Sequence, residues 1–317
     1  MKNIRIATLG TPHDYQSSLL PIVISSLGYK IDWVTPTKAD LVILGPFQDP
    51  SKKKYRWCPK PLRHLASSMD QSLNELLKTR KYQPLTLFHT QENVRHDHIK
   101  ADYSISFDLG VESDKHFRLP YWMEMLDWSH EGITTNTNPR YGELIKISTL
   151  MSPLGDRFLG RGGSCVLLSS HLREPRGSLY KALEKIIPIQ GYGANFDQSI
   201  RSHHASGFFK KDLLEKFSFN LCPENGLYPG YYTEKIPEAF NSGCLPITWA
   251  DNNLRFDFNP NALINLLDFA SQGYDSVSSI LLNSNVLEQF EEEALLTTQP
   301  SLEGLVKFIK FRLNELS

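Results

Sequence analysis

The sequence predicts an α/β fold in two domains. Short apolar segments alternate with helix-like segments along most of the chain, a pattern typical of parallel sheets covered by helices. The chain has 317 residues, which is more than one hydrophobic core usually supports. Residues 129–162 are rich in Gly, Asn, Thr, Pro and Arg and separate two such series. We therefore expect domains over 1–150 and 151–300, and a C-terminal helix over 301–317 that can pack back on the first domain.

The first domain is expected to begin directly with a strand. Apolar segments predict strands at Ile4–Leu9, Lys30–Val34, Leu41–Leu44, Leu85–Phe88 and Tyr103–Phe107. Helical spacing of apolar residues predicts helices at Ser17–Leu27, which Gly28 ends, and at Leu62–Leu77. Because the two kinds of element alternate, the strands are expected to pair in parallel, with helices on the faces of the sheet.

The second domain repeats the alternation. Strands are expected at Cys165–Leu168, Ile189–Gln190, Phe217–Leu221 and Leu245–Trp249. Helices are expected at Arg176–Ile187, at Lys211–Phe217 and from Thr233 to Gly243. Pro237 suits a first-turn position and helps to place the start of the last of these. The final helix, Leu302–Leu316, carries Lys and Arg among Leu and Phe.

Composition and charge exclude several classes of function. The formal net charge of −1 argues against generic nucleic-acid binding, which needs a clear basic excess, and leaves a local basic cleft open. The N-terminus lacks the pattern of a secretion signal, and no apolar run reaches the roughly 18 residues that a membrane helix needs. We expect a cytoplasmic protein without a transmembrane segment. The amphipathic last helix leaves open a peripheral contact with the inner face of a membrane.

Cysteines and histidines give no sign of a metal site. Four cysteines are scattered along the chain: Cys58, Cys165, Cys222 and Cys244. The last three lie in or beside apolar segments, so we expect buried thiols, as in a reducing compartment, rather than disulfides or zinc ligands. His96 and His98, and the pair His203–His204, lack a nearby cysteine pair or an HExxH arrangement, so no metal is expected.

Residues 217–250 carry the densest set of polar candidates. An apolar strand ends in Glu224–Asn225, a loop with three tyrosines follows, and Thr233-Glu234-Lys235 opens a helix. Open α/β sheets bind ligands at the carboxyl ends of their strands, and a helix N-terminus offers N–H groups to an anion. The segment predicts a nucleoside-diphosphate site without a Walker loop. The alternative is a polar loop followed by a charged first helical turn.

Two other regions carry candidates of the same kind. Arg173 and Arg176 stand where a helix begins, and guanidinium groups bind phosphate oxygens in pairs, so they predict a pyrophosphate clamp. Two solvated loop arginines are the alternative. Glu92 follows a predicted strand and is a candidate general base for an attacking hydroxyl; a capping glutamate is the alternative. The glycines of 160–163 do not follow a strand into a helix with a phosphate-loop lysine, which excludes a Walker loop and a dinucleotide fingerprint at this point. No glycine fingerprint follows the first strand either, which disfavours a dehydrogenase.

Several segments match known patterns, in order, over about residues 84–270. The pattern F-x-L-x-F-E-N, Y-x-T-E-K-I, A-G-C-x-P-I-x-W-G stands here as FNLCPEN, YYTEKI and NSGCLPITWA. Two upstream patterns also have counterparts: FHTQENVRHD corresponds to F-Y-T-G-E-N-x-R-P-D, and DYSISFD corresponds to D-Y-x-I-S-F-D. A further segment, SSHLREPRGSLYKAL, corresponds to the pattern S-N-x-x-x-x-x-R-x-x-x-Y-x-x-L. In these motifs the chain resembles the alpha-1,3/1,4-fucosyltransferases, glycosyltransferase family ten.

The resemblance implies a GT-B architecture, in which two Rossmann-like domains face each other across a cleft. The N-terminal domain would bind the acceptor and the C-terminal one the donor. The implied reaction is inverting transfer of L-fucose from GDP-β-L-fucose to a hydroxyl of a GlcNAc- or glucose-containing glycan, in α-1,3 or α-1,4 linkage. Glu92 would be the general base. No metal cofactor would be required, because cations of the chain stabilise the departing diphosphate.

The same resemblance assigns donor-binding roles by motif. Arg176 and Lys235 would hold the diphosphate and Glu234 the ribose hydroxyls. Asn225 and Tyr231 would shape the donor pocket, and Glu224 would lie near the fucose. Acceptor-binding residues are not identified. Departures from the pattern bear on sugar specificity: Gln91, His96, Pro223 and Ala250. The alternatives are a different GDP-linked sugar donor and a catalytically silent glycan- or nucleotide-binding protein.

Overall fold

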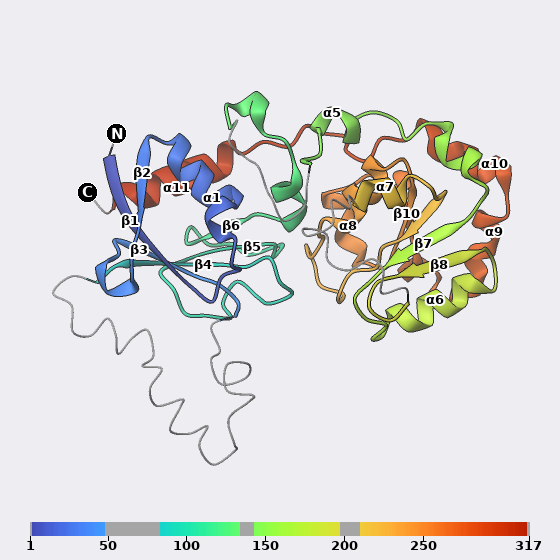
Figure 1. Ribbon diagram of the computed structural model, residues 1–317, viewed down its shortest axis with the longest axis horizontal. Helices are drawn as coiled ribbons and strands as arrows, with labels where there is room; N and C mark the ends of the chain where they lie inside the picture. Colours follow the sequence, from blue (N-terminus) through green and yellow to red (C-terminus); the bar gives the residue numbers. More distant parts are fainter. Residues whose placement is uncertain (1, 48–82, 134–142, 197–209, 316–317) are drawn as a thin grey trace, which may run out of the picture. The chain divides into compact units, whose positions relative to one another are not determined.

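The computed structural model describes residues 2–47, 83–133, 143–196 and 210–315 (Figure 1). The expected helix Leu62–Leu77, Cys58 and the pair His203–His204 lie outside these residues. The described chain divides into two compact units. Unit 1 comprises the described parts of Met1–Leu119, Trp128–Asn136 and Ser301–Ser317, and unit 2 those of Pro120–Asp127 and Thr137–Pro300.

Unit 1 is built on a parallel sheet. Among the described residues, its six strands lie in the order β2-β1-β3-β4-β5-β6, and every neighbouring pair is parallel. The strands are β1 (Lys2–Leu9), β2 (Tyr29–Trp33), β3 (Leu41–Leu44), β4 (Leu85–His89), β5 (Tyr103–Ser106) and β6 (His116–Arg118). β3 reads LVIL and all its side chains are buried, as expected of a central strand covered on both faces.

Two helices of unit 1 come from distant parts of the chain. α1 (Leu19–Ser26) follows β1, and α11 (Glu303–Asn314) comes from the C-terminal segment and contacts α1. Phe308 of α11 packs against Tyr103 and Phe117, with ring centroids 6.2 and 5.6 Å apart. The buried residues of α11 recur every four positions, at Leu305, Ile309 and Leu313. This helix is therefore part of the core of unit 1.

Unit 2 contains a second parallel sheet. Within the described residues its order is β11-β10-β9-β7-β8, and every neighbouring pair is parallel. The strands are β7 (Cys165–Leu168), β8 (Ile189–Tyr192), β9 (Phe219–Leu221), β10 (Leu245–Thr248) and β11 (Ile264–Asn265). The helices are α5 (Ile147–Leu150), α6 (Arg176–Glu184), α7 (Lys210–Leu214), α8 (Lys235–Asn241), α9 (Ser278–Leu281) and α10 (Ser284–Leu287). Two parallel sheets with helices confirm the predicted α/β class.

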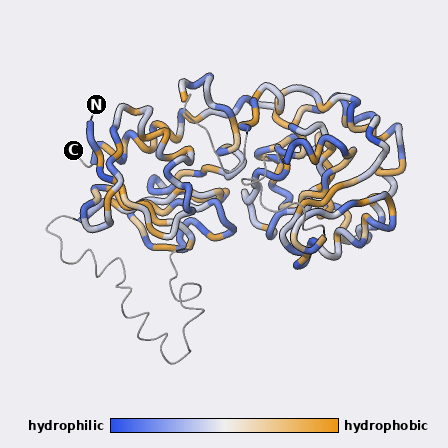
Figure 2. Tube along the Cα trace, in the orientation of Figure 1, coloured by the Kyte–Doolittle hydropathy of each residue, from blue (hydrophilic) through white to orange (hydrophobic). Residues whose placement is uncertain are grey.

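The core of each unit lies along its strands, where apolar residues gather (Figure 2). Three cysteines belong to the core of unit 2, as free and buried thiols: Cys165, Cys222 and Cys244. Burial raises the pKa of the first two thiols above the ordinary value and that of Cys244 to about 12. They therefore act as small apolar residues, as the sequence predicted.

Some elements differ from the sequence expectations. Residues 120–127 and 143–150, expected in the first domain, pack in unit 2, where Leu126 and Ile145 form a parallel bridge. A stretch rich in Gly and Pro marks irregular backbone, but it does not show where the chain crosses from one unit to the next. β6 was not predicted, because His-Phe-Arg carries no apolar run. Among the described residues, no helix combines the length and the apolar character needed to cross a bilayer.

Candidate functional site

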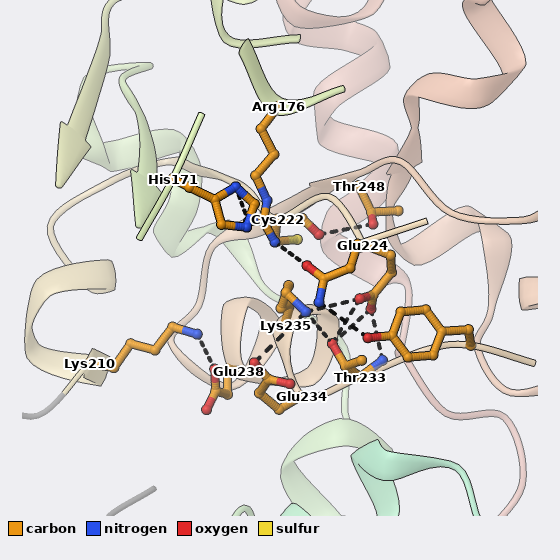
Figure 3. A network of polar contacts seen from close by, with 12 residues as sticks. His171, Arg176, Lys210, Cys222, Glu224, Thr233, Glu234, Lys235, Glu238 and Thr248 are labelled. Carbon is orange, nitrogen blue, oxygen red and sulfur yellow. Dashed lines mark hydrogen bonds and ion pairs between the residues drawn. The ribbon is translucent and has the colours of Figure 1, made fainter. Parts of the chain in front are cut away.

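The polar candidates of unit 2 gather at one edge of its sheet. β7 and β9 are parallel neighbours, so their carboxyl ends lie side by side. β7 leads to α6, which begins with Arg176, and β9 leads to α8, which begins with Lys235. Figure 3 shows the charged ends of both side chains directed toward the turn that carries Glu224. Two cations therefore meet at the edge where α/β sheets bind ligands.

Glu224 is the centre of a buried hydrogen-bond network. Its side chain has no exposed surface. Oε1 accepts a bond from the backbone N–H of Thr233 at 2.8 Å, and the Thr233 hydroxyl lies 2.9 Å from each carboxylate oxygen. Oε2 accepts from Nζ of Lys235 at 2.9 Å, and Nζ lies 2.6 Å from the Thr233 hydroxyl. The carboxylate thus fixes the ammonium group of Lys235 at the start of α8.

Electrostatics keep Lys235 and its neighbour Glu234 charged. Burial acts to lower the pKa of Lys235, but the carboxylates of Glu224 and Glu234 outweigh it and raise that pKa above its ordinary value. Burial acts to raise the pKa of Glu234, but the ammonium groups of Lys235 and Lys210 outweigh it and hold that pKa below its ordinary value. Oε1 of Glu234 lies 3.9 Å from Nζ of Lys235. Glu234 therefore presents a carboxylate, an acceptor for hydroxyl groups.

A second ion pair lies along α8, between Lys210 of α7 and Glu238. Burial acts to lower the pKa of Lys210, and the carboxylates of Glu238 and Glu234 raise it above its ordinary value. Sequence reasoning missed this pair. Glu238 stands one helical turn after Glu234, which was a usable signal, but nothing local connects it to Lys210, which is 28 residues away.

Arg176 is buried, with 8% of its surface exposed, and contacts two loops. Its Nη2 donates to Oδ1 of Asn225, and Nδ2 of Asn225 donates to the hydroxyl of Tyr231 at 3.3 Å. Its Nη1 lies 3.2 and 2.8 Å from the two ring nitrogens of His171. Burial lowers the pKa of Arg176, opposed by Glu224, Tyr231 and Glu234. An arginine retains its charge at neutral pH in any case, because its ordinary pKa is above 12.

The structure brings together all the donor-site residues predicted in the C-terminal half: Arg176, Glu224, Asn225, Tyr231, Glu234 and Lys235. Arg173, the second candidate for the clamp, is exposed, which fits the alternative of a solvated arginine. Sequence reasoning missed the hydroxyl of Thr233 and the ring of His171, because both contacts depend on how loops fold. The arrangement is suited to an anionic ligand with hydroxyl groups, since it offers fixed cations beside a carboxylate acceptor.

Glu92, the predicted base, belongs to unit 1. It stands just after β4, where its backbone N–H donates to the hydroxyl of Thr90 at 3.1 Å. Asp108, which is buried, supports the same loop by accepting from the backbone N–H of His96 at 2.9 Å. Glu92 itself is half-buried. This position after a central strand is the one expected from the sequence. The role of Glu92 as the general base stays a prediction.

Metal binding finds no support in the residues that the structure describes. Within them, no group of three or more His, Cys, Asp or Glu side chains is placed to hold an ion. His96 packs against His116, with ring centroids 5.1 Å apart, and its Nδ1 lies 4.0 Å from Oδ2 of Asp108. Burial, with His96 beside it, lowers the pKa of His116 to about 4. This cluster is therefore a packed part of unit 1.

Comparison with protein families identifies two matching regions. Residues 163–282 match the model described as glycosyltransferase family 10 (fucosyltransferase) C-term. Residues 74–125 match the alpha-(1,3)-fucosyltransferase FucT N-terminal domain. The alpha-(1,3)-fucosyltransferase FucT of Helicobacter pylori is 30% identical over 200 residues, which are 58% of this chain and 41% of that protein. The match thus spans about two fifths of the length of that relative.

Solved structures share the fold. A crystal structure of an alpha1,3-fucosyltransferase is similar over 99% of this chain and 90% of its own, with a TM-score of 0.68 at 23% identity. A crystal structure of alpha1,3-fucosyltransferase with GDP-fucose is similar over 99% of this chain and 91% of its own, with a TM-score of 0.64 at 20% identity. These similarities establish the α/β fold as GT-B in type. The two family matches fall in both units and include the residues of the site. The chain belongs to glycosyltransferase family 10, the fucosyltransferases.

Proposed function

We propose that the chain transfers L-fucose from GDP-β-L-fucose to a hydroxyl of a GlcNAc- or glucose-containing glycan, with inversion, to form an α-1,3 or α-1,4 linkage. The observation that carries the proposal is the pair of cations, the buried Arg176 and the half-buried Lys235, converging on the Glu224–Asn225 turn. Both lie within the matched family region. Family membership supports the reaction type, and the solved relative with GDP-fucose supports the donor.

Arg176 and Lys235 hold the diphosphate of the donor in this proposal. Guanidinium and ammonium groups form charge-assisted hydrogen bonds to phosphate oxygens, and partial burial strengthens them relative to exposed contacts. Glu234, which stays ionised, accepts hydrogen bonds from ribose hydroxyls. Asn225 and Tyr231 keep Arg176 in place through the hydrogen bonds that join the three side chains.

Glu224 takes a different role from the one expected beside the fucose. Its carboxylate is fully buried, and both oxygens are occupied by Thr233 and Lys235. A group so committed to protein partners is a poor contact for a sugar. We assign to Glu224 the positioning of Lys235, and leave the stabilisation of the sugar cation to other groups.

The reaction follows from these charges. Glu92 removes the proton from the acceptor hydroxyl, whose oxygen forms a bond to the anomeric carbon while the bond from that carbon to the diphosphate oxygen breaks. The electron pair of the broken bond stays on GDP, where the positive charges of Arg176 and Lys235 stabilise it. Attack from the face opposite GDP converts the β-linked donor into an α-linked product.

Two departures from the family motif lie in the interior of unit 2. Pro223 and Ala250 are buried, and the backbone N–H and C=O of Ala250 are bound by the side chain of Asn265 at 3.1 and 3.0 Å. They act on the donor pocket through packing. The donor sugar is therefore to be tested directly, with GDP-fucose, GDP-mannose and GDP-arabinose compared under the same conditions.

A glycan array incubated with GDP-fucose tests the proposal and reports the acceptor and the linkage class together. We expect fucose on GlcNAc- or glucose-containing glycans, with release of one GDP for each fucose. Transfer from another GDP-sugar alone would favour the alternative donor. Tight GDP binding without release of GDP on any acceptor would favour the catalytically silent binding protein.

A further inference from the structure

His171 lies in the loop between β7 and α6, beside the proposed diphosphate site (Figure 3). The family pattern around Arg176 leaves this position open, so the histidine is a feature of this chain and not of the motif. The ring is half-buried. Its hydrogen-bond partners in the structure are Nη1 of Arg176, 3.2 Å from Nδ1 and 2.8 Å from Nε2, and the backbone N–H of Arg173, 3.3 Å from Nδ1.

These partners can only donate. A neutral imidazole accepts a hydrogen bond at one ring nitrogen and carries a proton on the other, and an arginine has no acceptor atom. One ring N–H of His171 therefore faces a donor, whichever tautomer is present. Such a mismatch is removed when an acceptor enters between the ring and the guanidinium group. A phosphate oxygen is an acceptor of this kind.

The charges around the ring point to the same ligand. Among the described residues, the charged groups that act on His171 are Arg176 and Arg173, and both are positive. Burial, followed by these two arginines, lowers the pKa of His171 below its ordinary value of 6.5. The acidic groups Glu224, in the turn after β9, and Glu234, immediately before α8, act on Arg176. Without a ligand the imidazole is neutral at pH 7, because its surroundings oppose a further positive charge.

We propose that His171 is an additional ligand of the donor diphosphate, which takes up a proton when the anion binds. A diphosphate between the ring and Arg176 reverses the local charge, and an imidazolium can donate from both nitrogens to phosphate oxygens. The inference rests on the proposed donor site, and it adds a third cation, which is present only when the site is occupied. Donor binding is then linked to proton uptake.

The sign of the pH dependence follows from this linkage. Because the complex binds a proton that the free protein lacks, affinity for GDP rises as the pH falls through the range between the two pKa values of His171. For one proton the change is at most about tenfold per pH unit. Free GDP also takes up a proton near pH 6, as phosphate monoesters do. The contribution of His171 is therefore the difference between the wild-type chain and a variant that lacks the ring.

Titration calorimetry with GDP, in two buffers of different ionisation enthalpy and between pH 5.5 and 8, measures this difference. We expect the wild-type chain to take up more protons per GDP than His171→Gln at pH 7, and the variant to bind several-fold more weakly at pH 6. The two affinities should converge toward pH 8. His13→Gln, at an exposed position of unit 1, is the matched control and should behave as the wild type.

A second variant covers the case in which glutamine perturbs the loop. His171→Lys carries a permanent charge, so it should bind GDP with no extra proton uptake and with a pH dependence equal to that of GDP alone. Equal proton uptake by the wild type and both variants, with GDP binding intact, would overturn the role of His171 while leaving the donor site standing. Absence of GDP binding by the wild type would overturn the proposed function itself.

Discussion

The pair Glu224–Lys235 allows a double-mutant cycle in which stability and ligand binding are separated. Lys235→Met removes the ammonium group and leaves Glu224 buried, with three contacts from Thr233 remaining at 2.8, 2.9 and 2.9 Å. Loss of one partner of a buried pair costs about 3–5 kcal/mol, and the remaining contacts favour the lower end, about 3 kcal/mol. In Glu224→Gln, Nζ of Lys235 still has Oε1 of Glu234 3.9 Å away. We therefore expect a smaller loss of stability, about 1.5–3 kcal/mol.

The double variant Lys235→Met/Glu224→Gln removes both charges of the pair. We expect it to be more stable than the sum of the single losses predicts, by about 2 kcal/mol, as measured from urea unfolding of each variant. GDP affinity should fall by about 1–3 kcal/mol in Lys235→Met and equally in the double variant, because both lack the ammonium group. If the two single losses of stability add up to the loss in the double variant to within about 0.5 kcal/mol, Glu224 and Lys235 do not interact, and Glu224 does not position Lys235.

Three further outcomes are expected. Glu92→Gln should abolish transfer while calorimetric affinity for GDP is unchanged; turnover like the wild type would remove Glu92 as the base. Arg176→Ala should weaken GDP binding by about 1–3 kcal/mol, and an unchanged Kd would argue against the clamp. The pKa of His116 is about 4 in the folded chain, below its ordinary value of 6.5. Between these two values the unfolded chain binds a proton that the folded chain does not, so unit 1 should lose stability as the pH falls from 6.5 to 4. His116→Gln should reduce that loss in urea unfolding at pH 7 and pH 5, and an identical pH dependence would contradict it.

Regular elements of the fold were predictable because their apolar patterns are local. β3 has the bounds expected for Leu41–Leu44, and β7 those expected for Cys165–Leu168. Helix ends were less predictable. α1 begins at Leu19, because Ser18 has an extended backbone and Tyr15–Ser17 forms a separate helical turn. The first residue of a helix depends on backbone angles that several residue types adopt, so the sequence predicts the start of a helix only to within a few residues.

The candidate site was predictable as a set of residues but not as a network. The motif placed Glu224, Asn225 and Lys235 near one strand end, and the parallel neighbour β7 brought Arg176 to the same edge. Which partner each side chain takes depends on loop conformation. Only the structure shows that Glu224 is hydrogen-bonded to Thr233. The same holds for the hydrogen-bond donors that surround the ring of His171.

The assignment of α11 to unit 1 has a consequence for the order of events during synthesis. The described strands of unit 2, which end at Asn265, are all synthesised before residues 303–314 are made, whereas unit 1 still lacks Phe308, Leu305 and Ile309. Tyr103 and Phe117 keep an apolar surface uncovered for that interval. Unit 2 is then expected to mature first although it is encoded later, and the nascent first half is the part that needs chaperone protection.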